Sequence, residues 1–258
     1  KKNRKILWLE WVKAIQLPAE RKILGPSNKY LKGAAARYRK RIGKYLTEDK
    51  IYKTKGVKSW KKLLAIADEA GILKKAIGDP ISKIWSANGT EQLQNVFDMA
   101  GVPLDDIVFE HPEALARDVG RMAFQISEST GRYIEKAITR DLALGLSVDE
   151  IAINIGKIGA FAPSRAMRIA RTESARAVNA STNQAFRQAY AEGIDLKKQW
   201  LSSRDDKVRE AHRILDAQIT DVDGVFRVEG EEAESIGDFG AASLDVNCRC
   251  TILAVFEN

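Results

Sequence analysis

Residues 164–193 read SRAMRIARTESARAVNASTNQAFRQAYAEG, and residues 196–218 read LKKQWLSSRDDKVREAHRILDAQ. Two shorter stretches complete this region, VFRVEGEE at 225–232 and LDVNCRCTILAVF at 244–256. Polar and sulfur-bearing side chains recur here at unequal spacing, and the amphipathic pattern of a helix or a strand requires none of them. We therefore expect this region to form the unit around which the rest of the chain is arranged.

The order of patterns in this C-terminal region predicts a small α+β unit. A long helix rich in alanine and serine would let another backbone approach closely. If the last segment is a strand, Cys248, Cys250 and Ile252 share one face, because side chains alternate along a strand. The predicted elements are a helix at 164–192, a strand at 196–203, a short helix that begins near Asp205 and carries Arg209 and His212, a turn at 221–224, a strand at 225–228, a loop at 229–244 and a strand at 247–256.

The spaced residues of this region resemble the C-terminal domain of phage minor head proteins, the phage Mu F-like family, over about the last third of the chain. The resemblance implies a structural component of head assembly and of DNA packaging or ejection, joined to the portal region or the capsid interior. It also implies that the matching residues stabilise the domain through contacts within it. They are Arg171, Glu173, Trp200, Asp205, Arg209, His212, Asp216, Phe226, Asn247, Cys248, Arg249 and Cys250.

Two positions depart from the family pattern. The family often has glycine after the aspartate, where this chain has Ala217. It also often has a proline in the loop before the final cysteines, where this chain has Gly237, Gly240 and Ser243. The conformation of these loops is therefore less well specified than the strands.

The sequence before residue 164 predicts helices and little else. Apolar spacing and Pro/Gly punctuation place them at 3–17, 27–46, 58–77, two short helices within 81–100, one at 112–144, and one that begins at a capping box from Ser147 to Glu150. The fold class is thus α+β and predominantly helical: a long N-terminal helical region followed by a small C-terminal α+β domain with a short antiparallel sheet. We expect three segments, a basic helical arm (1–62), a helical region (63–163) and the Mu F-like domain (164–258).

Positive charge is concentrated at the N-terminus. Residues 1–62 contain 20 Lys and Arg against 4 Asp and Glu, a net charge of +16, whereas the chain as a whole carries +7. Basic residues interleaved with Tyr30 and Tyr38 can bind phosphates or an acidic protein surface. The alternative is a solvated basic face with both tyrosines in the core. The candidate binding residues are Arg37, Arg39, Lys40, Arg41 and Lys44.

The two cysteines are separated by one residue, so a disulfide between them would be strained, and free thiols suit a reducing cytoplasm. Cys248, Cys250, His212 and Asp205 have the ligand types of a zinc site. However, zinc-binding cysteines are usually two to four residues apart. The favoured interpretation is that both cysteines are small buried side chains. We therefore predict no metal and no cofactor.

Enzyme motifs are absent from the sequence: it has no G-x-S-x-G, H-E-x-x-H or P-loop pattern. One enzymatic alternative comes from a suggested distant likeness between this family and ADP-ribosyltransferases, since Glu232-Ala-Glu234 resembles their E-x-E element. We predict no catalysis. A second alternative is a free DNA-binding module built on the basic arm.

The family resemblance and the charge distribution together suggest the partners. We expect the portal protein, the major capsid protein and, through the basic arm, packaged double-stranded DNA. No run of about 18 apolar residues occurs, so no membrane span is predicted. The expected location is the virion, in the head or portal region, after assembly in the host cytoplasm.

Overall fold

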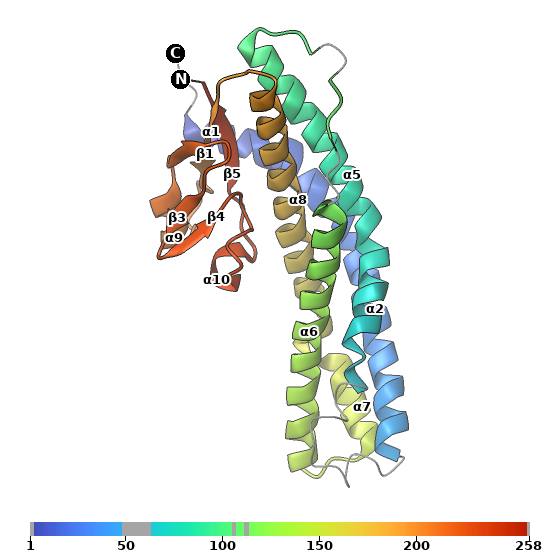
Figure 1. Ribbon diagram of the computed structural model, residues 1–258. Helices are drawn as coiled ribbons and strands as arrows, with labels where there is room; N and C mark the ends of the chain where they lie inside the picture. The colour runs from blue at the N-terminus through green and yellow to red at the C-terminus, as the bar shows by residue number, and fades with distance from the viewer. Residues whose placement is uncertain (1–2, 48–62, 105–106, 111–113, 257–258) are drawn as a thin grey trace. The chain divides into compact units, whose positions relative to one another are not determined.

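The computed structural model describes residues 3–47, 63–104, 107–110 and 114–256. Part of the predicted 58–77 helix and of the basic arm lies outside these ranges. The chain forms two compact units. Unit 1 combines Lys1–Ile23, Pro80–Pro112 and Arg168–Asn258, and unit 2 combines Leu24–Asp79 and Glu113–Met167. The fold is predominantly helical, with its short strands in the C-terminal part (Figure 1).

The helices are longer than predicted at the N-terminal end of the chain. A π-helical turn, η1, joins the first two without a break, and no described helix is long and apolar enough to cross a membrane. The helical elements are α1 (Arg4–Trp11), η1 (Val12–Gln16), α2 (Leu17–Thr47), α5 (Ile66–Ala100), α6 (Ala114–Ala143), α7 (Val148–Lys157), η2 (Gly159–Phe161), α8 (Pro163–Ala191), α9 (Glu210–Leu215) and α10 (Ala242–Asp245).

The gap predicted before residue 27, the gap between 77 and 81 and the division of 81–100 into two helices are wrong, because α2 continues through Pro26 and α5 continues through Pro80 and Gly89. A proline removes one helical hydrogen bond, at about 3 kcal/mol, but buried apolar residues continue on both sides of each proline. Gly89 allows close packing and does not form a turn, because a Cβ at this position would lie 2.0 Å from the Phe109 ring. Asn88, which also suggested a turn, donates to Ser181 and other groups of α8 within unit 1.

Unit 2 is a bundle of helical segments whose core includes both tyrosines of the basic helix. Tyr30 and Tyr38 are 4% and 0% exposed. The Tyr38 hydroxyl donates to the Leu64 carbonyl at 2.9 Å, and the Tyr30 hydroxyl lies 3.4 Å from Ser127 Oγ. Burial raises the pKa of Tyr30 to about 12. Both tyrosines therefore face the core, as expected if the basic residues of this helix form a solvated face.

The capping box at the start of α7 is confirmed. Ser147 Oγ accepts from the Glu150 N–H at 3.3 Å, and the Glu150 carboxylate accepts from the Ser147 N–H at 2.8 Å. These reciprocal bonds satisfy N–H groups that have no partner inside the helix.

Unit 1 holds the strands β1 (Lys197–Leu201), β2 (Ile219–Asp221), β3 (Phe226–Val228), β4 (Glu231–Ala233) and β5 (Thr251–Val255). The antiparallel sheet has the order β2-β1-β5, and β3 pairs with β4 in a separate hairpin. Trp200 on β1 is fully buried, with its ring 5.2 Å from that of Phe226 and 5.7 Å from that of His212. This aromatic cluster joins the sheet, the hairpin and α9.

Two loop predictions differ from the structure. The predicted loop at 229–244 contains β4 and the start of α10, which are too short for hydrophobic periodicity to reveal. The final strand begins at Thr251 rather than at residue 247, because Asn247 has φ +62° and turns the backbone out of extended geometry. Residues 248–250 are therefore outside any strand.

The N-terminal helix packs on the C-terminal sheet. Arg4 donates to the Trp200 carbonyl at 2.8 Å, and Trp8 Nε1 donates to the Arg249 carbonyl at 2.8 Å. The compact units thus follow a different division from the three predicted segments, since the first 23 residues group with the C-terminal part.

Candidate functional site

The Arg171-Thr-Glu173 cluster projects from α8 toward two distant parts of unit 1. Arg171 donates through Nε to Glu20 at 3.2 Å and through Nη1 to Asn247 Oδ1 at 3.0 Å. The Thr172 hydroxyl accepts from the Asn247 N–H at 2.9 Å. Arg171 and Thr172 therefore hold the left-handed turn at Asn247 in place.

Glu173 belongs to a buried acidic group beside α8. Burial raises the pKa of Glu173, although Arg176 opposes the shift with a 2.9 Å ion pair. Arg176 also donates to the Gly237 carbonyl at 2.8 Å. Asp245 accepts two backbone N–H bonds from 239–240, and burial raises its pKa as well. Charged side chains thereby fix the loop before β5.

Asp216 is a second polar centre, at the end of α9. It accepts from the Ser202 N–H and from Arg4, each at 2.9 Å, and from Arg204. Burial favours the neutral acid, but the Ser202 N–H and the two arginines outweigh it and lower the pKa of Asp216. The ionised carboxylate thus links α1 to the segment after β1.

Arg209 and Asp205 each connect the α9 region to the segment before β5. Arg209 donates to the carbonyls of Leu244, at 3.0 Å, and Val246. Asp205 forms an ion pair with Arg249 at 2.6 Å. A cavity of about 290 Å³ lies beside Asp205 and is lined by residues 202–205, Val208, Arg213 and Asp216. Both of its carboxylates are engaged by arginines.

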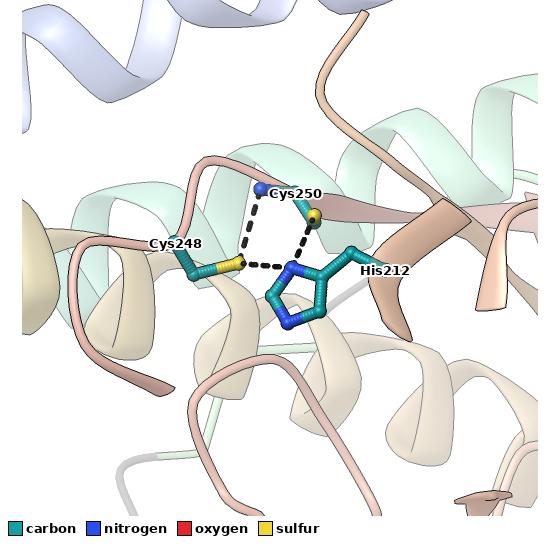
Figure 2. Close-up of side chains that lie close together, drawn as sticks. All are labelled: His212, Cys248 and Cys250. Carbon is teal, nitrogen blue, oxygen red and sulfur yellow. Dashed lines mark hydrogen bonds between the residues drawn. The ribbon is translucent and has the colours of Figure 1, made fainter. Parts of the chain in front are cut away.

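His212, Cys248 and Cys250 converge in the interior and are 2%, 3% and 1% exposed. His212 Nδ1 lies 3.5 Å from Cys248 Sγ and 3.3 Å from Cys250 Sγ. In Figure 2 the Nδ1 edge of the ring points at both sulfurs, and Nε2 points away from them. The Cys250 N–H also donates to Cys248 Sγ at 3.4 Å.

The two thiols of this cluster are unequal. Hydrogen bonds from Cys250, supported by His212, hold the pKa of Cys248 well below its ordinary value. Burial, together with the neighbouring Cys248, raises the pKa of Cys250. Cys248 therefore has the greater thiolate character, which is the form of cysteine that binds metals and reacts as a nucleophile.

Comparison with known proteins finds relatives of the region that contains these residues. The model of a family described as Phage Mu protein F like protein matches residues 132–253. Minor head protein GP7 of Bacillus phage SPP1 is 30% identical over 125 residues, 48% of this chain and 40% of that protein. Residues 132–253 belong to the phage Mu protein F-like family. Together with the similarity to GP7, this match supports a phage head morphogenesis family for this part of the chain.

Other relatives of this chain carry different names. A protein named NAD(+)--arginine ADP-ribosyltransferase EFV, from Enterococcus faecalis, is 34% identical over 139 residues, 54% of this chain and 28% of that protein. An uncharacterized protein from Haemophilus influenzae is 27% identical over 186 residues, 69% of this chain and 38% of that protein. The chain therefore spans well under half the length of these curated relatives. No solved structure matches.

The Mu F-like match begins at Arg132 within α6, earlier than the predicted boundary at residue 164. It includes the end of α6, all of α7 and α8, and the strands up to Leu253 of β5. All the predicted signature residues lie in unit 1. Their partners are mainly backbone groups and oppositely charged side chains of helices and loops.

The E-x-E element of the enzymatic alternative lies at the end of the β3–β4 hairpin. Glu232 forms an ion pair with Arg227 at 2.7 Å, and Glu234 forms one with Arg187 at 2.9 Å. Their side chains are 55% and 49% exposed. Both carboxylates therefore lie at the surface with a guanidinium partner.

The five basic candidates on α2 fall into two groups. Arg37 and Arg41 bind the buried Glu69, at 2.7 and 2.9 Å. Arg39, Lys40 and Lys44 are exposed. The two groups therefore differ in exposure, because Arg37 and Arg41 are half-buried and the other three side chains are exposed.

Several residues of these polar centres were not predicted from the sequence. Arg176 lies three residues after Glu173 on a helix, a spacing that indicates an ion pair, so it could have been found. Glu69 and Arg4 have no such local signal, because their partners are remote in the chain. Asp245 binds backbone N–H groups of a loop five and six residues before it, a contact that has no side-chain pattern.

Proposed function

We propose that the chain is a structural minor head protein of a tailed bacteriophage, associated with the portal or the capsid interior and acting in head assembly and in DNA packaging or ejection. The observation that carries the proposal is the use of the family's signature residues as internal connections. Arg171, Arg209 and Asp216 each bind groups in loops or in the N-terminal helix. Residues used in this way stabilise a docking module and are not arranged around a substrate.

Family membership and the similarity to a minor head protein support this role. The expected partners are the portal protein and the major capsid protein, and the expected location is the virion, after assembly in the host cytoplasm. Co-purification of the full chain with portal or capsid from infected cells tests the partners. Recovery of the chain with neither would contradict the proposed association.

Mass spectrometry of purified particles, before and after genome release, tests the role in the head. We expect the chain in intact particles, and its loss on genome release would assign it to ejection. Its retention would assign it to the shell or portal. Absence of the chain from intact particles would refute the proposal.

The exposed basic residues of α2 support a further part of the proposal, contact with packaged DNA. Such contact would be with phosphates and would weaken steeply as salt rises. We expect Arg39→Glu, Lys40→Glu and Lys44→Glu together to reduce the slope of log K against log salt by about 3, if each side chain meets one phosphate. Duplex binding by the full chain is measured by fluorescence anisotropy.

A matched control for the DNA experiment comes from the same unit. Arg132 and Lys136 on α6 are also exposed, and reversing both should leave the slope within about 0.5 if α2 is the contact. Equal loss in both variants would mean a non-specific charge effect, and no binding by the unaltered chain would remove DNA from the proposed partners.

The ADP-ribosyltransferase name of the Enterococcus relative favours a second candidate function, an NAD-consuming enzyme. Incubating the full chain with NAD and an arginine-containing acceptor tests it, with Glu234→Gln as the variant and Glu231→Gln as the control. The structural proposal expects no consumption of NAD above buffer. Consumption that is abolished by the first variant and retained by the second would establish the enzyme.

A further inference from the structure

The cluster of His212, Cys248 and Cys250 has the composition of a soft metal site. Thiolate and imidazole are the donors that zinc takes in proteins. Within the described part of the chain, these three residues form a group whose ligand atoms all lie within 4.8 Å of one another. We propose that the three residues bind one zinc-class divalent ion.

The distances between the donor atoms match tetrahedral coordination. Zn–S bonds of about 2.3 Å and Zn–N bonds of about 2.0–2.1 Å, set at the tetrahedral angle, separate sulfur from nitrogen by about 3.5–3.6 Å. The observed separations from His212 Nδ1 are 3.5 Å to Cys248 Sγ and 3.3 Å to Cys250 Sγ. Both sulfur–nitrogen separations therefore suit an ion bound by the imidazole and the two thiolates, and all three donor atoms lie within 4.8 Å of one another.

The short spacing of the cysteines is accommodated by the backbone. In an extended strand, side chains two residues apart are separated by about 6.6–6.8 Å, which is too far for one tetrahedral ion. Here Asn247 takes a left-handed conformation, and the strand begins only at Thr251. The chain therefore curves through residues 248–250 and brings both sulfurs toward one histidine nitrogen.

Close packing of small side chains explains the cluster less well. Within the described residues, His212 Nε2 is buried and has no hydrogen-bond partner. A buried polar group without a partner is unfavourable, and an apolar side chain would fill the same space without that penalty. Metal binding through Nδ1 would leave Nε2 unpaired, but it would give a reason to keep a buried imidazole here in spite of that penalty.

Three protein ligands leave one of the four tetrahedral positions for a water molecule or another small ligand. Asp205 is not the fourth ligand in this arrangement, because its carboxylate binds Arg249 and Ser203. The ion would link α9 to the segment before β5, close to the buried Trp200. The site is independent of the head-protein assignment, since either can hold without the other.

Titration of the reduced full chain with Co²⁺ under anaerobic conditions tests the proposal. The chain has two cysteines and two histidines in total, so thiolate-to-cobalt charge-transfer absorption can come only from Cys248 and Cys250. We expect saturation at one ion per chain, intense visible d–d bands typical of tetrahedral cobalt, and displacement by Zn²⁺. No saturable charge-transfer absorption from folded protein would overturn the proposal.

Variants then identify the ligands. Cys248→Ser, Cys250→Ser and His212→Gln should each weaken Zn²⁺ binding by at least about 100-fold, more than the loss of a supporting group around a metal causes. His111→Gln and Asp205→Asn are the controls and should bind as the unaltered chain does. Binding that survives both cysteine variants would refute the assignment of these ligands.

A measurement on the unaltered chain covers the case in which a variant fails to fold. Zn²⁺ at about 100 times its Kd should raise the thermal midpoint by about 5–10 °C. It should also protect both cysteines from alkylation by iodoacetamide. An unchanged midpoint together with unprotected thiols would mean that the three residues bind no ion.

Discussion

The two units of this chain bury charge in different ways. In unit 2, Glu69 is fully buried and is held by Arg37 and Arg41 from a neighbouring helix. Unit 1 instead distributes its charges over many connections, some to loops and some between helices, as at Asp216 and Arg209. A bundle needs few polar contacts because its helices satisfy their own backbone, whereas a small sheet with long loops needs side chains to fix its backbone.

This difference predicts how strongly a single substitution should destabilise each unit. A change at one buried carboxylate should affect unit 2 strongly, because no second contact replaces it. A change at one connection in unit 1 should have a smaller effect, because neighbouring connections hold the same loops. The following predictions test this contrast, beginning with the largest expected effect.

Glu69→Gln should lower the free energy of unfolding by about 3–5 kcal/mol, because it leaves two arginines beside a neutral side chain in a buried site. Urea unfolding followed by circular dichroism measures it. Asp118→Asn is the control, since its exposed pair with Arg121 should contribute less than about 1 kcal/mol. Similar losses in the two variants would mean that burial of the pair in unit 2 is unimportant.

Asp216→Asn should lower the free energy of unfolding by about 2 kcal/mol at pH 7, from the loss of charge-assisted hydrogen bonds to Arg4 and Arg204. The folded pKa of Asp216 lies below its ordinary value of 3.8. Its stabilisation is therefore complete above that value and is lost as the pH falls through the folded pKa. Urea midpoints of variant and unaltered chain should differ at pH 7 and converge as the pH falls through the folded pKa of Asp216.

The control for this pH experiment is Asp221→Asn, whose side chain is 82% exposed and 3.8 Å from Lys197. It should change the midpoint little at either pH. A difference between Asp216→Asn and the unaltered chain that persists undiminished in acid would show that charge at this position is not what stabilises unit 1.

Gly89→Ala should destabilise unit 1 by about 1–2 kcal/mol, because the added methyl group must displace the Phe109 ring. Gly71→Ala, on the same helix, meets no atom within 4 Å and should stabilise the protein by about 0.5–1 kcal/mol. Thermal unfolding compares the two variants. A gain in both would mean that Gly89 is not needed for close packing.

Ala217→Gly has the smallest expected effect, a gain of about 0.5–1 kcal/mol. Ala217 has φ +68°, a conformation that is unfavourable for a residue with a Cβ. Ala180→Gly in α8 is the control and should instead lose about 1 kcal/mol. Urea unfolding measures both. A loss at Ala217 would show that its left-handed conformation carries little strain.

Periodicity was enough to predict α6, α8 and the capping box of α7, because apolar spacing and local capping are encoded within a few residues. It failed at Pro26, Pro80 and Gly89, where packing against other elements overrides a local signal for a break. The family often has glycine where this chain has Ala217. The φ of +68° at Ala217 explains this preference, because glycine adopts a positive φ without the steric cost of a Cβ.

The candidate site was predicted by residue type but not by geometry. The matching residues were named in the sequence, yet the partners of Arg171, Arg209 and Asp216 lie far along the chain and left no local pattern. The close approach of Cys248 and Cys250 depends on the turn at Asn247, which the predicted strand did not contain. A strand at 247–256 would have placed the two cysteine side chains too far apart for one tetrahedral ion. Residues 248–250 are outside any strand, so this objection to a metal does not apply.

The docking of α1 on the sheet has a practical consequence for anyone preparing this domain in isolation. A fragment cut at the limits of the family match, residues 132–253, would lack two contacts from α1. One is the hydrogen bond from the Trp8 indole to the Arg249 carbonyl, and the other is the ion pair between Arg4 and Asp216. Expression designs should therefore retain the first 23 residues or supply α1 as a separate peptide. Complementation between the two pieces would then report directly on how tightly this helix is held.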